Sequence, residues 1–325
     1  MKIYSKISDI KYYLPPKLLS NEDLVFDNPD WRMDDIEKKT GIKYRYICED
    51  AQTSKDIALL ACEKIFNSNV RRSDIDFLVV VTESPEYIAP AMSCDLQNSL
   101  GLETSIASFD VNLGCSGFVY GLMIADSILC ANNYSNGLLV CVDTYSKYIS
   151  SNDRTCRPLF SDAASATLIT ASKKKTVGPF VLGTDGSGYK DLMVKNSGTI
   201  KNVDTERNLY FMNGSAVFMF TMRVVPKAVN DLLIKEKCNK EDIDLFVFHQ
   251  ASKLVLENLI RSMSLNKNKV FINLNDVGNT VSASIPIALK DAETQGRLKN
   301  GDTIMLVGFG VGLSWGATLT TWREV

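Results

Sequence analysis

Short apolar runs alternate along this chain with stretches in which apolar side chains recur every three or four residues. The runs FLVVV (77–81), LLVCV (138–142) and LFVF (245–248) predict buried strands, because a strand that is covered on both faces is apolar throughout. Helical spacing precedes two of these runs, at 54–69 and at 223–238. Strands that alternate with helices predict parallel α/β units.

The two halves of the chain repeat this pattern in the same order. Four pairs of segments match in register: DIDFLVVVTES (74–84) with DIDLFVFHQAS (242–252), IASFDVNLG (106–114) with KVFINLNDVG (269–278), LLVCVDTYS (138–146) with TIMLVGFGVG (303–312), and ASATLIT (164–170) with WGATLTT (315–321). Such a repeat predicts a duplication whose halves are related by a pseudo-twofold axis.

The end of the first copy gives the expected domain boundary. A charged stretch with Gly and Pro follows the first copy near 173–178, and we therefore expect two domains, 1–174 and 175–325. The segment 185–213 is polar, rich in Gly and weakly periodic, which is typical of a loop or cap inserted early in the second half.

Composition and charge exclude several classes of protein. The chain has 325 residues, a net charge of -2 and 45% hydrophobic residues, so a large core is available. No long basic run indicates a nucleic-acid partner, and no apolar run approaches the roughly 20 residues that span a bilayer. The eight cysteines form no C-x-x-C pair, so we expect neither a zinc site nor disulfides. The N-terminus carries charges where a signal peptide is apolar, and we predict a cytoplasmic protein.

One cysteine stands at a predicted turn from a strand into a helix. Cys115 lies in DVNLGCSGFVYGL, where the β-like run ends at Gly114 and helical spacing begins at Gly117. The N–H groups at a helix N-terminus favour a thiolate, and small neighbours leave the sulfur accessible. We interpret Cys115 as a nucleophile and the other cysteines as buried and inert; an inert role is also the alternative for Cys115.

Two polar residues of the second half are candidates to act with this cysteine. His249 is the only histidine and follows the run 245–248, at the strand end where open α/β sheets bind ligands. A histidine packed in the core is the alternative. Asn279 occupies a place in the second half close to that of Cys115 in the first. A pseudo-twofold would bring all three into one cleft, where Cys115 can take an acyl group and the two N–H donors can stabilise an enolate.

Glycines are dense in GFGVGLSWGA (308–317), at the end of a predicted strand. A phosphate-binding loop is the alternative interpretation, but a helix should follow such a loop and here the β-like ATLTTW follows. We therefore expect the backbone to approach a reacting oxygen closely. The backbone N–H groups of Cys115 and of Val311 would form the oxyanion hole.

In this order, GCSGF, HQAS, GNTVSASIP and GFGVGLSWG resemble the β-ketoacyl-acyl-carrier-protein synthase III family. TGI (40–42), FSDAASA (160–166) and NGSAVF (213–218) extend the resemblance over most of the chain. It implies a thiolase fold of two similar five-stranded αβαβα halves, and a homodimer. It also implies an acyltransferase that loads an acyl group from acyl-CoA onto Cys115. The enzyme would then condense this group with malonyl-acyl carrier protein, with decarboxylation and with no metal or other cofactor.

The resemblance also implies roles for individual residues. Cys115 would be the nucleophile, and His249 with Asn279 would bind the thioester oxygen during decarboxylation. Trp31 and Arg154 would sandwich the CoA adenine by stacking and cation–π attraction, with surface packing as the alternative for Trp31. Phe218 and Phe309 would line the acyl tunnel, and Gly214 would lie beside the pantetheine arm. The expected substrate contacts are therefore Trp31, Ala89, Arg154, Gly214, Phe218, Ala251, Lys253 and Phe309.

Several positions depart from the family pattern. Trp31 stands about four residues further from TGI than is usual. The basic residue that often follows HQA is displaced to Lys253, and Met219 replaces a lysine that helps to dock the acidic carrier protein, which weakens that encounter. Ala89 stands where members that use acetyl primers often have phenylalanine, so we expect a tunnel that accepts longer primers.

Other functions stay open from the sequence. A related acyltransferase of a specialised pathway would pass its acyl group to a non-malonyl acceptor. A thiolase would need a second cysteine in the C-terminal glycine loop, and plant-type polyketide synthases are usually longer. A binding module without catalysis would leave Cys115, His249 and Asn279 unexplained.

Overall fold

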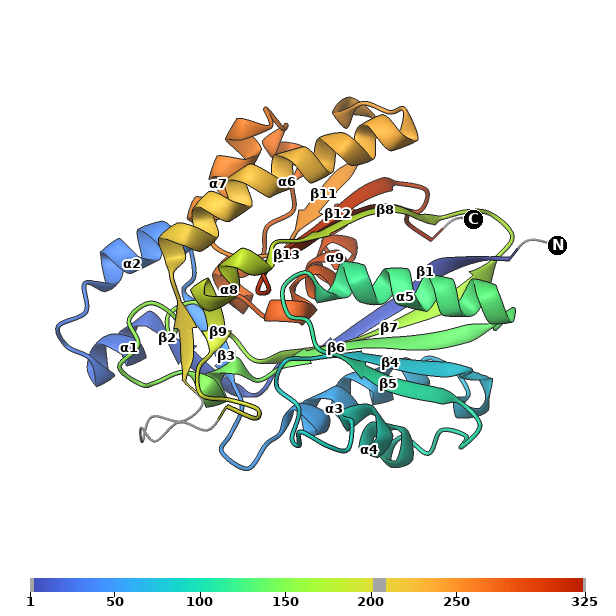
Figure 1. Cartoon of the computed structure of the whole chain (residues 1–325), viewed down its shortest axis with the longest axis horizontal. Helices are drawn as coiled ribbons and strands as arrows, with labels where there is room; N and C mark the ends of the chain where they lie inside the picture. The colour runs from blue at the N-terminus through green and yellow to red at the C-terminus, as the bar shows by residue number, and fades with distance from the viewer. Residues whose placement is uncertain (1–2, 201–208, 324–325) are drawn as a thin grey trace.

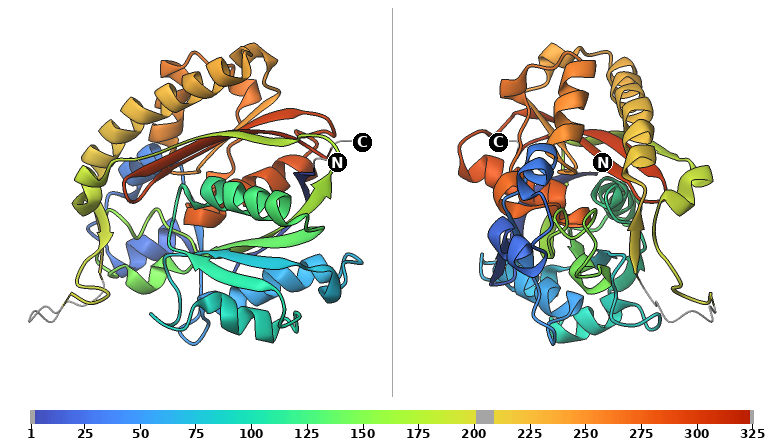
Figure 2. Two further views of the ribbon diagram at one scale, coloured as in Figure 1. Left: turned by 45° about the vertical axis from the view of Figure 1, so that its right-hand side comes forward. Right: turned by 90° about the vertical axis from the view of Figure 1, so that its left-hand side faces the viewer.

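The computed structural model describes residues 3–200 and 209–323, which form two β-sheets with helices between and outside them (Figure 1). The part of the predicted cap at 201–208 lies outside the described residues. Figure 2 shows the same layers after rotation, with helices on both outer faces and in the middle.

The first sheet takes all its strands from the first half of the chain. Its strands lie in the order β1-β7-β6-β4-β5, with β6, β4 and β5 parallel and the other pairs antiparallel. The predicted strands 77–81 and 138–142 are confirmed within it. The bounds are β1 Tyr4–Tyr13, β4 Phe77–Val81, β5 Ala107–Val111, β6 Asn136–Asp143 and β7 Ala163–Ser172.

The second sheet takes its strands from the second half. Its order is β11-β12-β13-β8, with β11 parallel to β12 and the other pairs antiparallel. The bounds are β8 Val177–Thr184, β11 Leu245–Phe248, β12 Thr303–Gly310 and β13 Ser314–Thr321. The chain passes from one sheet to the other between Ser172 and Val177, and the division into two domains at 174/175 stays a prediction.

Two helices fill the space between the sheets. α5 (Gly117–Asn132) contacts strands of both sheets, and α9 (Ser284–Thr294) packs between β1 and β11 (Figure 1). The faces that these two helices turn toward the sheets are apolar, because those faces are covered by strands. One apolar cluster joins α5 and α9 to the inner faces of both sheets.

The outer faces are covered by further helices. α3 (Ser54–Phe66) and α4 (Met92–Ser99) cover the first sheet, and α6 (Gly214–Glu236) and α7 (Lys253–Ser262) cover the second. The helices predicted at 54–69 and 223–238 are confirmed as α3 and the greater part of α6. A capping box between Thr53 and Asp56 fixes the start of α3.

Smaller elements gather at one end of the molecule. The segment predicted as a loop or cap at 185–213 contains the hairpin β9–β10. The bounds are β2 Lys17–Ser20, α1 Asn21–Asp27, α2 Met33–Thr40, β3 Tyr44–Ile47, β9 Leu192–Val194, β10 Tyr210–Met212 and α8 Leu274–Val277.

The second sheet has fewer strands than the resemblance implied. The segment 269–278 echoes β5, yet it makes a single bridge between Val270 and Phe246, so the described second sheet has four strands where the resemblance implied five. The reason lies in the Gln250 side chain. It donates a hydrogen bond to the carbonyl of Phe271 and accepts one from the N–H of Asn273. These bonds occupy backbone groups that a longer strand would have paired.

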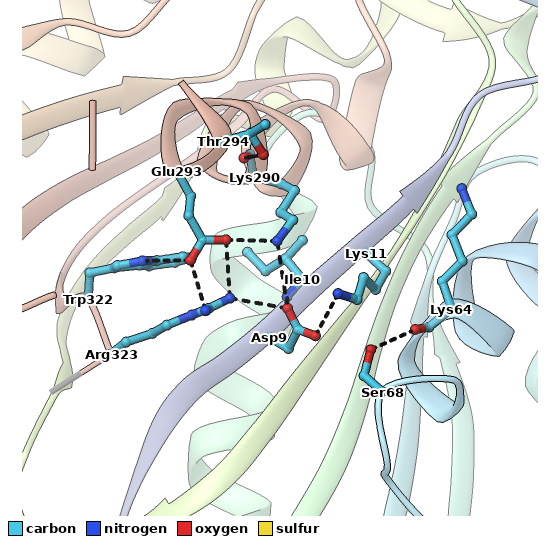
Figure 3. Close-up of polar contacts among 10 residues, drawn as sticks. All are labelled: Asp9, Ile10, Lys11, Lys64, Ser68, Lys290, Glu293, Thr294, Trp322 and Arg323. Atoms are coloured by element: carbon cyan, nitrogen blue, oxygen red, sulfur yellow. Dashed lines mark hydrogen bonds and ion pairs between the residues drawn. The ribbon is translucent and has the colours of Figure 1, made fainter. Parts of the chain in front are cut away.

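A cluster of charged side chains fixes the carboxyl end of the chain to the first sheet (Figure 3). Arg323, just after β13, lies 3.1 Å from Asp9 of β1 and 2.9 Å from Glu293 of α9. Lys290 lies 2.7 Å from Glu293. Because these side chains are partly buried and several charges interact together, the cluster contributes more than an isolated surface ion pair.

Candidate active site

A pocket of about 910 Å³ opens at the carboxyl ends of the central strands. Cys115, His249 and Asn279 all line it, as does the start of α6. The structure therefore brings together the three side chains that the repeat placed in one cleft. The other residues predicted as substrate contacts that line this pocket are Gly214, Phe218, Ala251 and Phe309.

Cys115 lies in the turn between β5 and α5, directly before the helix. β12 packs closely against this turn: a Cβ built on Gly310 would lie 2.8 Å from the Cys115 sulfur. No side chain fits in that space without displacing the sulfur, so the sequence requires glycine there. The glycine-rich segment was expected to bring its backbone close to a reacting atom, and the structure places the backbone of Gly310 beside the Cys115 side chain.

The ionisation of Cys115 differs from the expectation. Burial raises the pKa of the Cys115 thiol above its ordinary value, and the Glu83 carboxyl raises it further. The backbone N–H groups of Val311 and of Cys115 itself bond the sulfur and act in the opposite direction. The prediction that the helix N-terminus makes a ready thiolate is therefore wrong for the free enzyme, because desolvation outweighs the N–H groups.

His249 is held in place by its backbone and by a hydrogen bond at one ring nitrogen. Its backbone continues the ladder between β11 and β12, and its Nδ1 lies 2.7 Å from the Ser284 hydroxyl. Phe309 packs edge-to-face on the ring with a centroid distance of 5.6 Å. Burial lowers the pKa of His249 to about 3. The imidazole is therefore neutral near pH 7, and its Nε2 remains for the pocket.

Asn279 has its amide oriented by the backbone. Its Oδ1 accepts a hydrogen bond of 3.0 Å from the N–H of Val281, so the NH₂ group points the other way. That group lies 3.4 Å from the carbonyl of Ala251, at the pocket wall. An amide has two N–H donors, and one of them is available to a ligand.

Four predicted contacts are not among the residues that line the pocket. Trp31 is only 8% exposed and packs with Leu24 and Met33, so the structure does not present its ring to a ligand. Arg154 and Lys253 are exposed next to pocket residues, and Ala89 is exposed on the loop before α4. The contacts of these residues with substrate stay predictions.

Two polar residues at the site were missed by the sequence reading. Ser284 bonds His249, and Glu83 acts on Cys115. A signal for Glu83 was present, because it stands two residues after β4, at the position that the repeat pairs with Ala251. A lone acidic residue at the carboxyl end of a buried strand is a candidate site residue.

The arrangement suits acyl transfer followed by carbon–carbon bond formation. A thiol supported by two backbone N–H groups can accept an acyl group, and two neutral N–H donors can stabilise an enolate oxygen. A two-sheet α/β fold with a cysteine, a histidine and an asparagine in one pocket is the pattern of condensing acyltransferases.

Comparisons with known proteins agree on one family. The model of 3-oxoacyl-[acyl-carrier-protein] synthase III matches residues 109–186, and the model of its C-terminal part matches 233–322. A β-ketoacyl-[acyl-carrier-protein] synthase III from Caldanaerobacter subterraneus is 36% identical, with 99% of each chain covered. One from Clostridium tetani is 33% identical, with 95% of this chain and 96% of the relative covered.

Solved structures agree as well. A crystal structure of a 3-oxoacyl-(acyl-carrier-protein) synthase III is 38% identical with a TM-score of 0.95, and covers 98% of this chain and 100% of its own. The synthase III from Pseudomonas aeruginosa is 32% identical with a TM-score of 0.90, and covers 99% of each chain. The chain belongs to the 3-oxoacyl-[acyl-carrier-protein] synthase III family and has the thiolase fold, as the motifs implied.

Membership decides between the functions that the sequence left open. The chain is a condensing acyltransferase, and the specialised acyltransferase with a non-malonyl acceptor is not favoured. Within the described ranges no helix is both long and apolar enough to cross a bilayer. In the same ranges no group of His, Cys, Asp and Glu side chains is placed to hold a metal ion.

Proposed function

We propose that this enzyme takes an acyl group from acyl-CoA onto Cys115 and condenses it with malonyl-acyl carrier protein, with loss of carbon dioxide. The product is a 3-oxoacyl thioester, and no cofactor takes part. The observation that carries the proposal is the single pocket that holds Cys115 with the neutral His249 and with Asn279.

In the first half-reaction the Cys115 sulfur attacks the thioester carbonyl. The N–H groups of Cys115 and Val311 both point at the sulfur, so they also lie near the oxygen of the tetrahedral intermediate. Two such donors, fixed by the backbone, stabilise developing negative charge without reorganisation. Coenzyme A then leaves as the thiol.

In the second half-reaction malonyl thioester loses carbon dioxide and becomes an enolate. His249 Nε2 and the Asn279 amide would bind the enolate oxygen, and its carbon would attack the acyl group on Cys115. A histidine that remains neutral stabilises this oxygen by hydrogen bonding and not by charge, so the position of the ring proton decides its effect.

Ser284 is expected to set that position. A hydroxyl that donates to Nδ1 keeps the ring proton on Nε2, where it can face a ligand. Ser284→Ala should raise the Nδ1–H population and slow condensation roughly tenfold, the equivalent of one hydrogen bond. Acyl loading should be unchanged.

The single histidine makes this prediction measurable. In protein labelled with ¹⁵N-histidine, every ring signal comes from His249, and the two tautomers have distinct nitrogen shifts. Ser284→Thr keeps the hydroxyl and should behave as the wild type. Identical nitrogen shifts in wild type and Ser284→Ala would exclude a role for Ser284 in tautomer choice.

The proposed function is tested by mass spectrometry of the intact protein after incubation with acetyl-, butyryl-, hexanoyl- and octanoyl-CoA. We expect one acyl group per chain, and release of that group as a 3-oxoacyl thioester when malonyl-acyl carrier protein is added. Each methylene buried in an apolar tunnel contributes about 0.8 kcal/mol, so primers longer than acetyl should load better until the tunnel ends. Loading without release by the malonyl substrate would contradict condensation.

We also propose a homodimer, as the family resemblance implies. β5 is an edge strand with one unpaired side, and an exposed edge is a natural site for pairing with a second copy. Tyr87 and Ile88 are 64% and 87% exposed in the loop that leads into α4, and the first N–H groups of α4 bond Asp110 of β5. Sedimentation should give twice the mass of one chain, and a monomer would contradict this proposal.

A further inference from the structure

A carboxyl group lies directly behind the nucleophile, and the proposed reaction does not yet use it. Glu83 follows β4, and its Oε2 is in contact with Gly114, the residue before Cys115. The Gly114 N–H and the Tyr145 hydroxyl both donate to the Glu83 carboxyl. Gly114 has no side chain, and this lets the carboxyl reach the cysteine turn.

The surroundings of Glu83 contain further acidic groups. Asp143 at the end of β6 is fully buried, accepts a hydrogen bond of 2.9 Å from the Glu83 N–H and bonds Ser282. Tyr145 and Tyr210 pack ring against ring beside it. The pKa of Glu83 is shifted by Asp143, Tyr145 and Gly114. The pKa of Cys115 is raised by the carboxyls of Glu83 and Asp143. Negative charge in this cluster is costly, so ionisation of one member opposes that of the others.

The carboxyl is balanced between its two forms near neutral pH. Burial, together with the charge of Asp143, raises the pKa of Glu83 to about 8. A carboxyl with these properties can both accept and donate a proton under working conditions. His249, with its pKa lowered to about 3, is a poor base for the same task.

We propose that Glu83 carries the proton that the Cys115 sulfur loses on acyl loading and regains on release of the product. The inference rests on the proposed function and deepens it. It follows from the contact of the carboxyl with the cysteine turn, from its bond to Tyr145, and from the burial of the sulfur among acidic groups.

The proton balance closes over one catalytic cycle. In loading, the Glu83 carboxylate takes the thiol proton, the sulfur forms the new thioester bond, and the CoA thiolate leaves and is protonated by solvent. In release, the enolate carbon bonds the acyl carbon, the acyl–sulfur bond breaks, and neutral Glu83 returns the proton to the Cys115 thiolate. Malonyl decarboxylation supplies the electron pair of the new carbon–carbon bond, and no oxidant or reductant is required.

The two half-reactions should depend on pH in opposite ways. Loading needs the carboxylate, so its rate should rise as the pH passes through about 8. Release needs the acid, so its rate should fall over the same range. Asp143 is the other carboxyl in the cluster, and burial raises its pKa as well; its negative charge, once formed, holds the pKa of Glu83 higher.

Glu83→Gln is the test, because glutamine keeps an acceptor for the Gly114 N–H and removes the titrating group. Alkylation of Cys115 by iodoacetamide, measured between pH 6 and 9.5, should rise near pH 8 in the wild type, and the variant should lose this rise. Acyl loading at pH 8 should fall about 10²-fold, as is typical for loss of a general base. Glu83→Asp should recover part of the alkylation rise, and thermal unfolding verifies that each variant folds.

Glu86→Gln is the matched control, since it makes the same change three residues further along, where the carboxylate bonds the Lys55 N–H and not the cysteine turn. It should alkylate and load as the wild type. An unchanged alkylation profile in Glu83→Gln, with loading within about threefold of the wild type, would overturn the proposal. The alkylation readout needs no acyl-CoA or malonyl substrate, so failure of the wild type to load acyl-CoA would count against the proposed function and not against Glu83.

Discussion

Replacement of Cys115 by alanine is expected to abolish covalent loading from every acyl-CoA, because no other nucleophile is proposed for the reaction. Loss of a nucleophile that acts together with its partners costs on the order of 10⁶ in rate. Cys115→Ser should also fail, since a hydroxyl beside the Glu83 carboxyl is a far weaker nucleophile than sulfur. Intact mass spectrometry and peptide mapping would show loading on the Cys115 peptide of the wild type and on no peptide of either variant.

Cys94→Ala is the matched control for this substitution. Cys94 is exposed in α4 and does not line the pocket, so its loss should leave loading unchanged. An acyl group found on Cys94 in the wild type, or retained by Cys115→Ala, would assign the nucleophile elsewhere. Because all eight cysteines carry free thiols, the mapping compares every candidate under one set of conditions.

The sequence predicted the location of the site better than its electrostatics. A pseudo-twofold axis brings the ends of equivalent strands of the two halves to one cleft, so the repeat alone placed Cys115, His249 and Asn279 near one another. The ionisation of Cys115 was not predictable in this way, because it depends on how much water the pocket excludes and on Glu83, a residue 32 positions away in the chain. The spacing of apolar residues predicts which face of a helix or strand is buried, but it does not predict which charged side chains lie next to that face.

The segment 269–278 shows a second limit of sequence patterns, because it matches 106–114 in the repeat but does not form the matching strand. The segment has the apolar content of a strand, but the Gln250 side chain takes backbone groups that a strand would pair. Side chains that substitute for a neighbouring strand depend on tertiary contacts, which one sequence does not display. Trp31 illustrates the same dependence on tertiary contacts, since its indole packs in the small cluster with Leu24 and Met33, and its contact with CoA stays a prediction.

The separation of the two half-reactions is the strongest test of the roles of His249 and Asn279. His249→Ala and Asn279→Ala should each slow condensation with malonyl-acyl carrier protein by about 10²–10³, the usual cost of losing one oxyanion donor. Both variants should still load acyl groups, because the backbone N–H groups of Cys115 and Val311 serve that step. Single-turnover loading followed by addition of the malonyl substrate measures the two rates separately in the same sample.

A control variant and a defined contrary outcome complete this test. Asn275→Ala removes an exposed amide from the same segment without touching the pocket, so both of its rates should match the wild type.

Burial lowers the pKa of His249 to about 3, so the imidazole is neutral at every pH between 6 and 9. Its contribution to condensation should therefore be the same over that range. Any pH dependence in that range must then come from other groups, of which Glu83 is the first candidate. If His249→Ala and Asn279→Ala failed to load acyl groups but still decarboxylated malonyl thioester, the two residues would serve the first half-reaction, and the enolate would have to be stabilised by the backbone of the cysteine turn.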